Sequence, residues 1–341
     1  MFLRRHWLAL ALSVAVGAAL LWLLRQGALP VLPDRQSQKS LNFAVVPLYA
    51  LLFSVVLVVR AARWVWLLAP IHKVPMRRIL LVSFVFYGAS VALPFRMGEA
   101  VRPALIRQKG KLSAWAATGT VAAERVVDGL FASLILFASL WIARPLDPLP
   151  DTIGGLPVPA ALVPKAAYSA LLLFAVAFLA ILVFYLWRNW ARTTTERVIG
   201  WVSPALGKWT ADKVDHLADG FRFLPQLKYS LPFLLATAGY WFLSALGMWF
   251  LMRAAGLEGI EFVQVTAVLG VLSLGMLVPN APGFFGTFQI SVYAGLAMYR
   301  PGDEVVGAGS VAVFWMYVVQ IGLCVLGGII ATALEVRLRP D

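Results

Sequence analysis

The sequence predicts an all-α polytopic membrane protein, with about six full spans and two re-entrant hairpins in two inverted-topology repeats. Three observations lead to this fold class. Hydrophobic residues make up 61% of the 341 residues and charged residues only 13%, whereas a soluble domain carries about 25% charged residues. Apolar runs recur along the chain, each near the roughly 20 residues that cross a bilayer. Two further apolar runs are short and end at prolines.

Six segments are predicted to cross the membrane as helices, because each is apolar over most of a bilayer's thickness. The only cysteine, Cys324, lies inside the last of them, which excludes an intramolecular disulfide and a cysteine-rich metal site. The three histidines are far apart, and we expect neither a metal nor a cofactor. The predicted spans are Trp7–Leu24, Ala44–Leu68, Thr118–Ala143, Ala166–Trp187, Leu231–Leu251 and Val305–Thr332.

Two other apolar segments are interrupted. Leu80–Leu93 has 14 residues, or about 21 Å of helix against a hydrocarbon core of about 30 Å. Val263–Val278 is likewise followed by prolines and then by a second short apolar piece. Proline removes a backbone donor and clashes with the preceding turn. We therefore expect re-entrant segments at 80–117 and 263–299. The predicted helix breaks are Pro94, Pro279, Pro282 and Gly286.

The basic residues indicate the orientation of the chain. If both broken segments re-enter, 21 of the 29 Lys and Arg residues fall in the N-terminus, 60–78, 96–111, 188–228 and the C-terminus. Because Lys and Arg accumulate on the cytoplasmic side, we expect a bacterial inner (cytoplasmic) membrane protein with both termini in the cytoplasm. The net charge of +13 is then a topology signal, and no nucleic-acid partner is expected.

The order of spans and breaks repeats. Residues 1–143 form a first predicted membrane repeat, 144–165 an outer loop, and 166–341 a second repeat that starts on the other side of the membrane. Inverted repeats of this kind are common in transporters, whose binding sites lie where the repeats meet. Within the second repeat, 188–230 has apolar residues at helical spacing. This linker is predicted to form one or two amphipathic helices at the cytoplasmic membrane surface.

Six ionisable residues cluster in the sequence near membrane depth, where each charge costs roughly 2.5–3.5 kcal/mol on insertion scales. Thr120, Glu124 and Asp128 share one helical face, which must therefore meet protein or water. Two interpretations stay open. The charges pair and lock the first broken segment, or the arginines bind an anionic group such as phosphate, which guanidinium contacts through two oxygens. The six residues are Arg96, Glu99, Arg102, Glu124, Arg125 and Asp128.

Other polar residues have simpler expected roles. Arg60 and Arg63 lie near the inner end of a span and are expected to snorkel to anionic headgroups. Asn280, Thr287 and Gln289 are the polar side chains around the second break, where they are expected to cap freed backbone groups. With Gly283, Asn280 and Gln289 are also candidate substrate contacts. Gly283 and Gly286 permit a tight backbone geometry.

Three motifs resemble a known family. They are Leu93–Arg102 (LPFRMGEAVR), Ala123–Asp128 (AERVVD) and Val278–Gln289 (VPNAPGFFGTFQ). Together they resemble the flippase-like membrane-domain family, which includes the transmembrane domain of lysylphosphatidylglycerol synthase and stand-alone relatives. The resemblance implies transbilayer movement of lipids or handling of lipid-linked precursors. Phe284 and Gln289 stand where the family has a glycine and an acidic residue.

We therefore expect a flippase-like lipid transporter that moves an anionic phospholipid or lipid-linked phosphate headgroup, with Arg96 and Arg102 binding the headgroup. It is expected not to be an enzyme. Expected partners are a membrane phospholipid or polyprenyl-linked lipid, a second copy, or envelope-biosynthesis enzymes. One alternative is a polyprenyl-phosphate-dependent glycosyl or headgroup transferase that uses Asp34, Asp147 or Asp151. The other is a non-catalytic scaffold for envelope lipid biosynthesis.

Overall fold

The computed structural model describes residues 22, 30–93, 98–107, 112–150, 152–153, 156–157, 162–201, 203–277 and 281–337. Helices make up most of this part of the chain. The strands in it, β1 (Thr152–Ile153) and β2 (Leu156–Pro157), form a single antiparallel ladder. The predicted helical fold is confirmed for these residues, with that small ladder as an addition.

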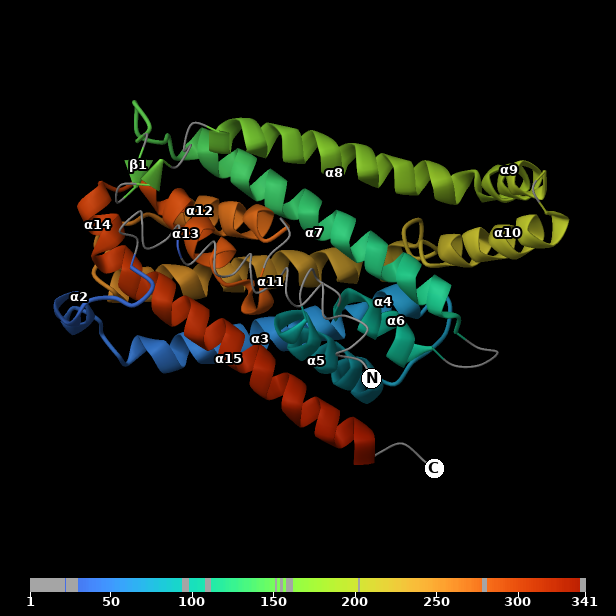
Figure 1. Cartoon of the computed structure of the whole chain (residues 1–341), viewed down its shortest axis with the longest axis horizontal. Coiled ribbons are helices and arrows are strands. Elements are labelled where there is room, and N and C mark those ends of the chain that lie inside the picture. Colours follow the sequence, from blue (N-terminus) through green and yellow to red (C-terminus); the bar gives the residue numbers. More distant parts are fainter. Residues whose placement is uncertain are drawn as a thin grey trace.

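Five helical segments are long and apolar enough to cross a membrane, and they match five of the six predicted spans. The sixth, Trp7–Leu24, lies outside the described residues apart from residue 22. Figure 1 shows the long helices running between two ends of the molecule. The five segments are α3 (Val45–Ala62) with α4 (Trp64–Leu68), α7 (Ala114–Ile142), α8 (Leu162–Leu186), α11 (Leu227–Ala254), and α14 (Gly302–Val306) with α15 (Ala308–Arg337).

Polar side chains mark where several helices begin. Ser113 accepts a hydrogen bond from the backbone N–H of Ala116 at 3.0 Å and starts α7. Ser203, followed by Pro204, starts α10 (Pro204–Asp219) in the same way. Glu261 and Gln264 form a capping box at the start of α12 (Phe262–Gly275). These caps satisfy backbone donors that the helices themselves leave unpaired.

The first broken segment forms two helices that pack against each other. α5 (Met76–Ala92) ends before Leu93, whose backbone is extended with φ −96° and ψ 138°, as expected for the residue before a proline. A 3-10 turn at 98–100 leads into α6 (Val101–Ile106), which contacts α5. With 17 residues, α5 is about 25 Å long and shorter than the hydrocarbon core. Pro94 lies outside the described residues.

The second broken segment also contains two short helices in contact. α12 ends at Gly275, and a 3-10 turn at Pro282–Phe284 precedes α13 (Thr287–Ala297), which packs along α12. Gly283 and Gly286 have φ values of 71° and 85°, a region that glycine enters without steric cost. The tight backbone geometry predicted for these two glycines is confirmed.

Two polar side chains stabilise the turn between α12 and α13. Phe284 in this turn also has a positive φ, 56°, which costs a side-chain-bearing residue roughly 1–2 kcal/mol. The amide oxygen of Gln289 accepts a hydrogen bond from the N–H of Gly286 at 2.7 Å. The hydroxyl of Thr287 donates to the carbonyl of Phe284 at 3.0 Å. Gln289 and Thr287 therefore have the predicted capping roles.

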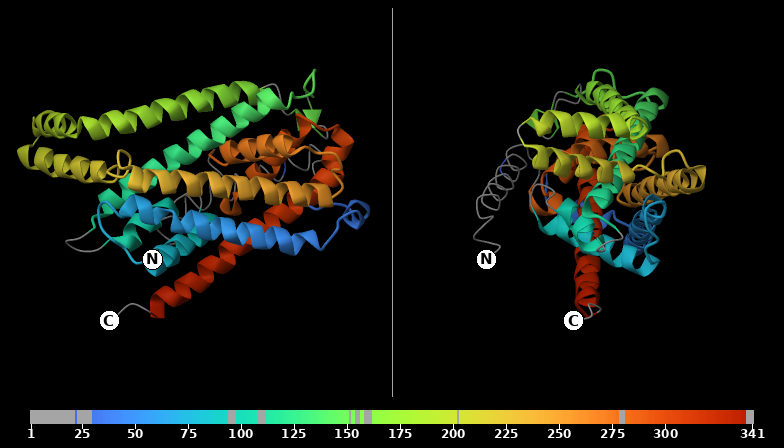
Figure 2. Two further views of the ribbon diagram at one scale, coloured as in Figure 1. Left: turned by 180° about the vertical axis from the view of Figure 1, so that it is seen from behind. Right: turned by 90° about the vertical axis from the view of Figure 1, so that its right-hand side faces the viewer.

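α7 joins the two halves of the sequence. It packs against α6, α8, α10 and α12, while α11 packs against α3 and α15 against α5. Figure 1 shows α7 crossing the molecule diagonally beneath α8. Both views in Figure 2 show the C-terminal end of α15 extending beyond the other helices. Segments far apart in the sequence are thus neighbours along most of the bundle.

The predicted amphipathic linker forms two helices at the end of the molecule opposite β1 and α14 (Figure 1). α9 (Arg188–Gly200) lies against α10, which begins at Pro204 directly after its N-cap residue Ser203. Arg188 pairs with Asp215 at 3.2 Å, and Arg192 pairs with Asp212 at 3.2 Å. Exposed indole rings are typical of membrane interfaces. The exposed tryptophans around this pair are Trp187, Trp190, Trp201 and Trp209.

Candidate functional site

Arg63 lies at the junction of α3 and α4, and its side chain is fully buried, 0% exposed. Its Nη2 donates to Glu124 at 3.0 Å and to Asp128 at 2.6 Å. Its Nη1 donates to the hydroxyl of Thr237 at 2.7 Å. The prediction that Arg63 snorkels to the surface is therefore wrong. Two carboxylates inside the bundle provide charge-assisted hydrogen bonds, which are stronger than neutral ones.

The two carboxylates lie on one face of α7, as the spacing predicts. Glu124 is 2% exposed and Asp128 9%. Tyr240 donates to Oδ1 of Asp128 at 2.8 Å, while Arg63 occupies Oδ2. One turn away, the indole of Trp64 donates to the hydroxyl of Thr120 at 2.9 Å. Side chains of α11 and of the α3–α4 junction therefore both donate hydrogen bonds to this face of α7.

Two more arginines complete the ionic cluster. Arg102 donates to Oε2 of Glu124 at 2.9 Å, and its guanidinium carbon lies 4.0 Å from the centroid of the Trp64 ring. Arg125 pairs with Glu99 at 3.3 Å and with Glu124 at 3.7 Å. Both oxygens of Glu124 thus receive a donor. The structure brings together five of the predicted site residues: Glu99, Arg102, Glu124, Arg125 and Asp128.

Arg60, one helical turn before Arg63, has a different environment. Its guanidinium carbon lies 5.3 Å from the centroid of the Tyr240 ring and 5.9 Å from that of Tyr87, which are cation–π distances. Within the described part of the chain it has no ion pair, and its buried Nε lacks a hydrogen-bond partner. Arg60 is therefore an inward-facing cation whose charge is balanced only by aromatic rings and by more distant carboxylates.

The charges of the cluster do not cancel. Among the described residues it contains four arginines and three carboxylates, which leaves one positive charge in excess. Pairing accounts for Arg63, Arg102 and Arg125 and links α6 and the α3–α4 junction to α7. It does not account for Arg60. Both interpretations of the sequence therefore have support: a structural network, and beside it a cation available to an anion.

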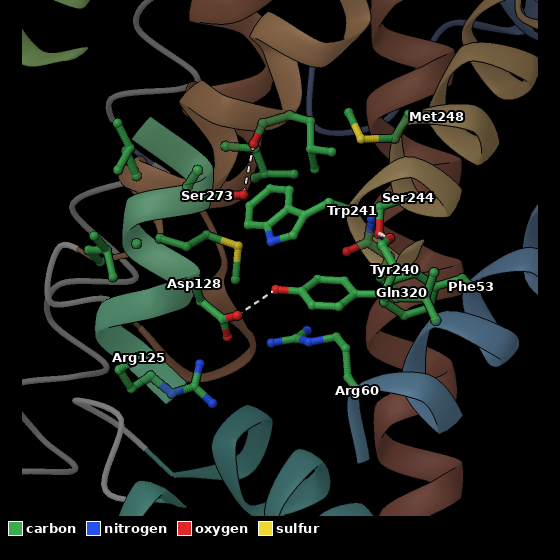
Figure 3. Close-up of a pocket in the computed structure, with 18 of the residues that line it drawn as sticks. Phe53, Arg60, Arg125, Asp128, Tyr240, Trp241, Ser244, Met248, Ser273 and Gln320 are labelled. Carbon is green, nitrogen blue, oxygen red and sulfur yellow. Dashed lines mark hydrogen bonds between the residues drawn. The ribbon is translucent and has the colours of Figure 1, made fainter. Parts of the chain in front are cut away.

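A cavity of about 190 Å³ lies beside this cluster, between α3, α7, α11, α12 and α15. Figure 3 shows Arg60, Arg125 and Asp128 at one end, with Tyr240 and Trp241 along a side. A site that is polar at one end and apolar elsewhere suits an amphiphilic ligand. Tyr49 and Gln320, which hydrogen-bond to each other at 2.7 Å, also line it. The apolar lining includes Phe53, Val56, Ala132, Met248, Leu269, Leu272 and Leu277.

The other predicted site residues fall into two groups. Arg96, Asn280, Pro94 and Pro279 lie outside the described residues. Gly283, Gln289 and the breaks Pro282 and Gly286 form the turn between α12 and α13, and none of them lines the cavity.

Five residues of the site were not among the predicted ones: Arg60, Arg63, Thr237, Tyr240 and Trp241. One signal for Arg63 is present in the sequence. Two buried carboxylates on one face require cations, and Arg60 and Arg63 are one turn apart on a neighbouring span. The aromatic residues carry no such signal, because tyrosine and tryptophan are common throughout this chain.

The fold and this site define a multi-pass helical membrane protein with a paired ionic cluster and a cavity between its spans. Residues 7–327 match the family model of the lysylphosphatidylglycerol synthase TM region, and the chain belongs to this family. The resemblance seen in the three motifs is thereby confirmed. No curated protein and no solved structure matches the chain.

Proposed function

We propose that this protein moves lipids with an anionic headgroup across the membrane, and that the cavity beside Arg60 binds the headgroup. The membership of a lipid-related membrane family supports this proposal. The cavity volume of about 190 Å³ suits a headgroup and leaves the acyl chains in the surrounding lipid. A transporter of this kind needs no catalytic residue.

The single observation that carries the proposal is the environment of Arg60. An unpaired charge within a span is costly and marks a site that meets a charged partner. Arg60 lines the cavity with Arg125 and Asp128, so the cavity wall carries one net positive charge. A phosphate group in the cavity would neutralise this charge and accept hydrogen bonds from guanidinium groups. Arg102, expected to bind the headgroup, instead supports Glu124.

Replacing Arg60 by glutamine should abolish most lipid movement while leaving the fold intact. Loss of a hydrogen bond from a charged group removes roughly 1.5–3 kcal/mol, or about tenfold to a hundredfold in rate. The rate is measured in liposomes that contain phosphatidylglycerol with a fluorescent acyl chain. A membrane-impermeant reductant added outside quenches only the labelled lipid in the outer leaflet, so the rise of the quenched fraction with time gives the rate of movement between leaflets. Arg60→Lys should keep part of the rate, because it keeps the charge.

The matched control is Arg77→Gln, which removes an exposed arginine at the start of α5. It should move lipid at the wild-type rate. Equal rates of lipid movement for Arg60→Gln and the wild type would show that Arg60 does not bind the headgroup. Absence of lipid movement by the wild-type protein, compared with protein-free liposomes, would overturn the proposed function itself.

We also propose that α5–α6 and α12–α13 are re-entrant hairpins that enter from opposite sides, as in an inverted repeat. Each pair packs together, and α5 and α12 are shorter than the five segments that are long enough to cross a membrane. Each pair lies toward a different end of the bundle in Figure 1. Both termini would then be cytoplasmic, in agreement with the distribution of basic residues.

Cysteine labelling tests this topology. In a Cys324→Ser background, Arg107→Cys and Arg197→Cys should react with an impermeant maleimide from the same side of the membrane. Lys165→Cys, at the start of α8, should react only from the other side. All three positions are exposed. Labelling of positions 107 and 197 from opposite sides would mean that the first broken segment crosses fully, and the inverted repeat would then be wrong.

A further inference from the structure

Trp241 contributes a donor to the cavity that no protein group uses. It follows Tyr240 on α11, and the ring centroids of the two residues are 5.6 Å apart. The side chain is 7% exposed, and its indole Nε1 has no hydrogen-bond partner. Figure 3 shows the indole among the cavity-lining residues, with its nitrogen on the edge that faces Tyr240 and Asp128. A buried polar group without a partner destabilises the protein, and a ligand acceptor would offset this cost.

The charged groups around this nitrogen are also biased toward donors. Arg60 and Arg125 line the same end of the cavity. The buried Nε of Arg60 has no hydrogen-bond partner, whereas the Nε of Arg125 lies 3.3 Å from a carboxylate oxygen of Glu99. The one carboxylate there is Asp128, and each of its oxygens already accepts a hydrogen bond, from Tyr240 and from Arg63. Ser244 and Ser273 donate their hydroxyl hydrogens to backbone carbonyls of their own helices. Among the described lining residues, the cavity thus offers an unused charged donor on Arg60 and no carboxylate oxygen without a hydrogen bond.

We propose, on the basis of the proposed function, that the cavity selects headgroups with a phosphate diester and no ammonium group. The indole N–H of Trp241 donates one of the hydrogen bonds to the phosphate. A single negative charge matches the single positive charge of the lining residues. An ammonium group would bring a second positive charge next to Arg60 and Arg125 into a site of low dielectric, where like charges repel strongly.

Two lipids with the same labelled acyl chains test this selectivity in liposomes: phosphatidylglycerol, an anionic diester, and phosphatidylethanolamine, which carries an ammonium group. The wild-type protein should move phosphatidylglycerol about tenfold faster, which corresponds to roughly 1.4 kcal/mol. Trp241→Phe keeps the aromatic ring and removes only the N–H. It should slow both lipids by the same several-fold factor, because both headgroups contain the phosphate diester that accepts this hydrogen bond, and the ratio of the two rates should stay that of the wild type.

The matched control is Trp209→Phe, an exposed tryptophan of α10 away from the cavity, which should keep the wild-type rates. Equal rates for the two lipids in the wild-type protein would overturn the selectivity while leaving transport intact. An unchanged rate for phosphatidylglycerol in Trp241→Phe would overturn the role of the indole. If neither lipid moves, the proposed function fails. In that case the selectivity is tested by native mass spectrometry of the detergent-purified protein with each lipid. Preferential retention of phosphatidylglycerol supports the selectivity, and equal retention of the two lipids overturns it.

Discussion

Arg63→Ala should destabilise the protein more than any other single substitution in the ionic cluster. The change leaves Glu124 and Asp128 buried without their shared cation. Removing one partner of a buried ion pair costs about 3–5 kcal/mol, because an uncompensated charge stays behind. The result should be a melting temperature several degrees lower, measured by intrinsic fluorescence during heating in detergent. Arg77→Ala, at an exposed position, should have the melting temperature of the wild type.

A charge-balanced variant separates burial of charge from loss of packing. The double change Arg63→Met and Asp128→Asn removes one cation and one anion, and Glu124 keeps its pairs with Arg102 and Arg125. Replacing a buried ion pair with neutral residues of similar volume is often close to neutral in stability. The double variant should therefore melt above Arg63→Ala. If it melts lower, the packing of the Arg63 side chain is more important than its charge.

Gly119→Val should separate α10 from α7. Gly119 of α7 lies against the backbone of Leu217 and Gly220 at the end of α10, and a Cβ there would overlap the carbonyl oxygen of Leu217. Because the obstacle is backbone on both sides, a rotamer change cannot relieve it. Overpacking of this kind costs roughly 1–3 kcal/mol. We expect a lower melting temperature and faster protease cleavage in the segment between α9 and α10.

Gly239→Ala is the matched control, because this glycine of α11 has no atom near the position of an added Cβ. It should be neutral or raise stability by about 0.5–1 kcal/mol, the usual difference between glycine and alanine inside a helix. Wild-type protease resistance of Gly119→Val would show that the α7–α10 contact tolerates a side chain. The close backbone approach would then be dispensable.

The sequence was sufficient to predict the long helices. Five predicted spans correspond to helices in the structure, because a run of about 20 apolar residues has few alternatives to a spanning helix. The ends were less accurate: α7 starts at Ala114 and α11 at Leu227, four residues before the predicted spans in each case. These first turns are specified by capping and by contacts rather than by hydropathy.

The breaks were predictable for local reasons, and the interior charges only in part. Leu93 is disfavoured in a helical conformation by the proline that follows it. The face shared by Glu124 and Asp128 follows from helical periodicity. The identity of the residue that pairs with this face does not follow from periodicity, because a single sequence contains no information about which helix lies opposite α7. Arg63 therefore appeared to belong to the membrane surface, whereas contact between the α3–α4 junction and α7 buries it.

The linear order of the cluster bears on how the chain enters the bilayer during translation. Arg63 and Arg102 leave the ribosome before α7, so both cations precede the carboxylates of Glu124 and Asp128. Each acidic group can thus reach hydrocarbon with a counter-ion already present. Tyr240, on the later α11, adds its hydrogen bond to Asp128 last. Synthesis in the reverse order would bring two bare anions into lipid, so the arrangement favours stepwise insertion from the N-terminal side.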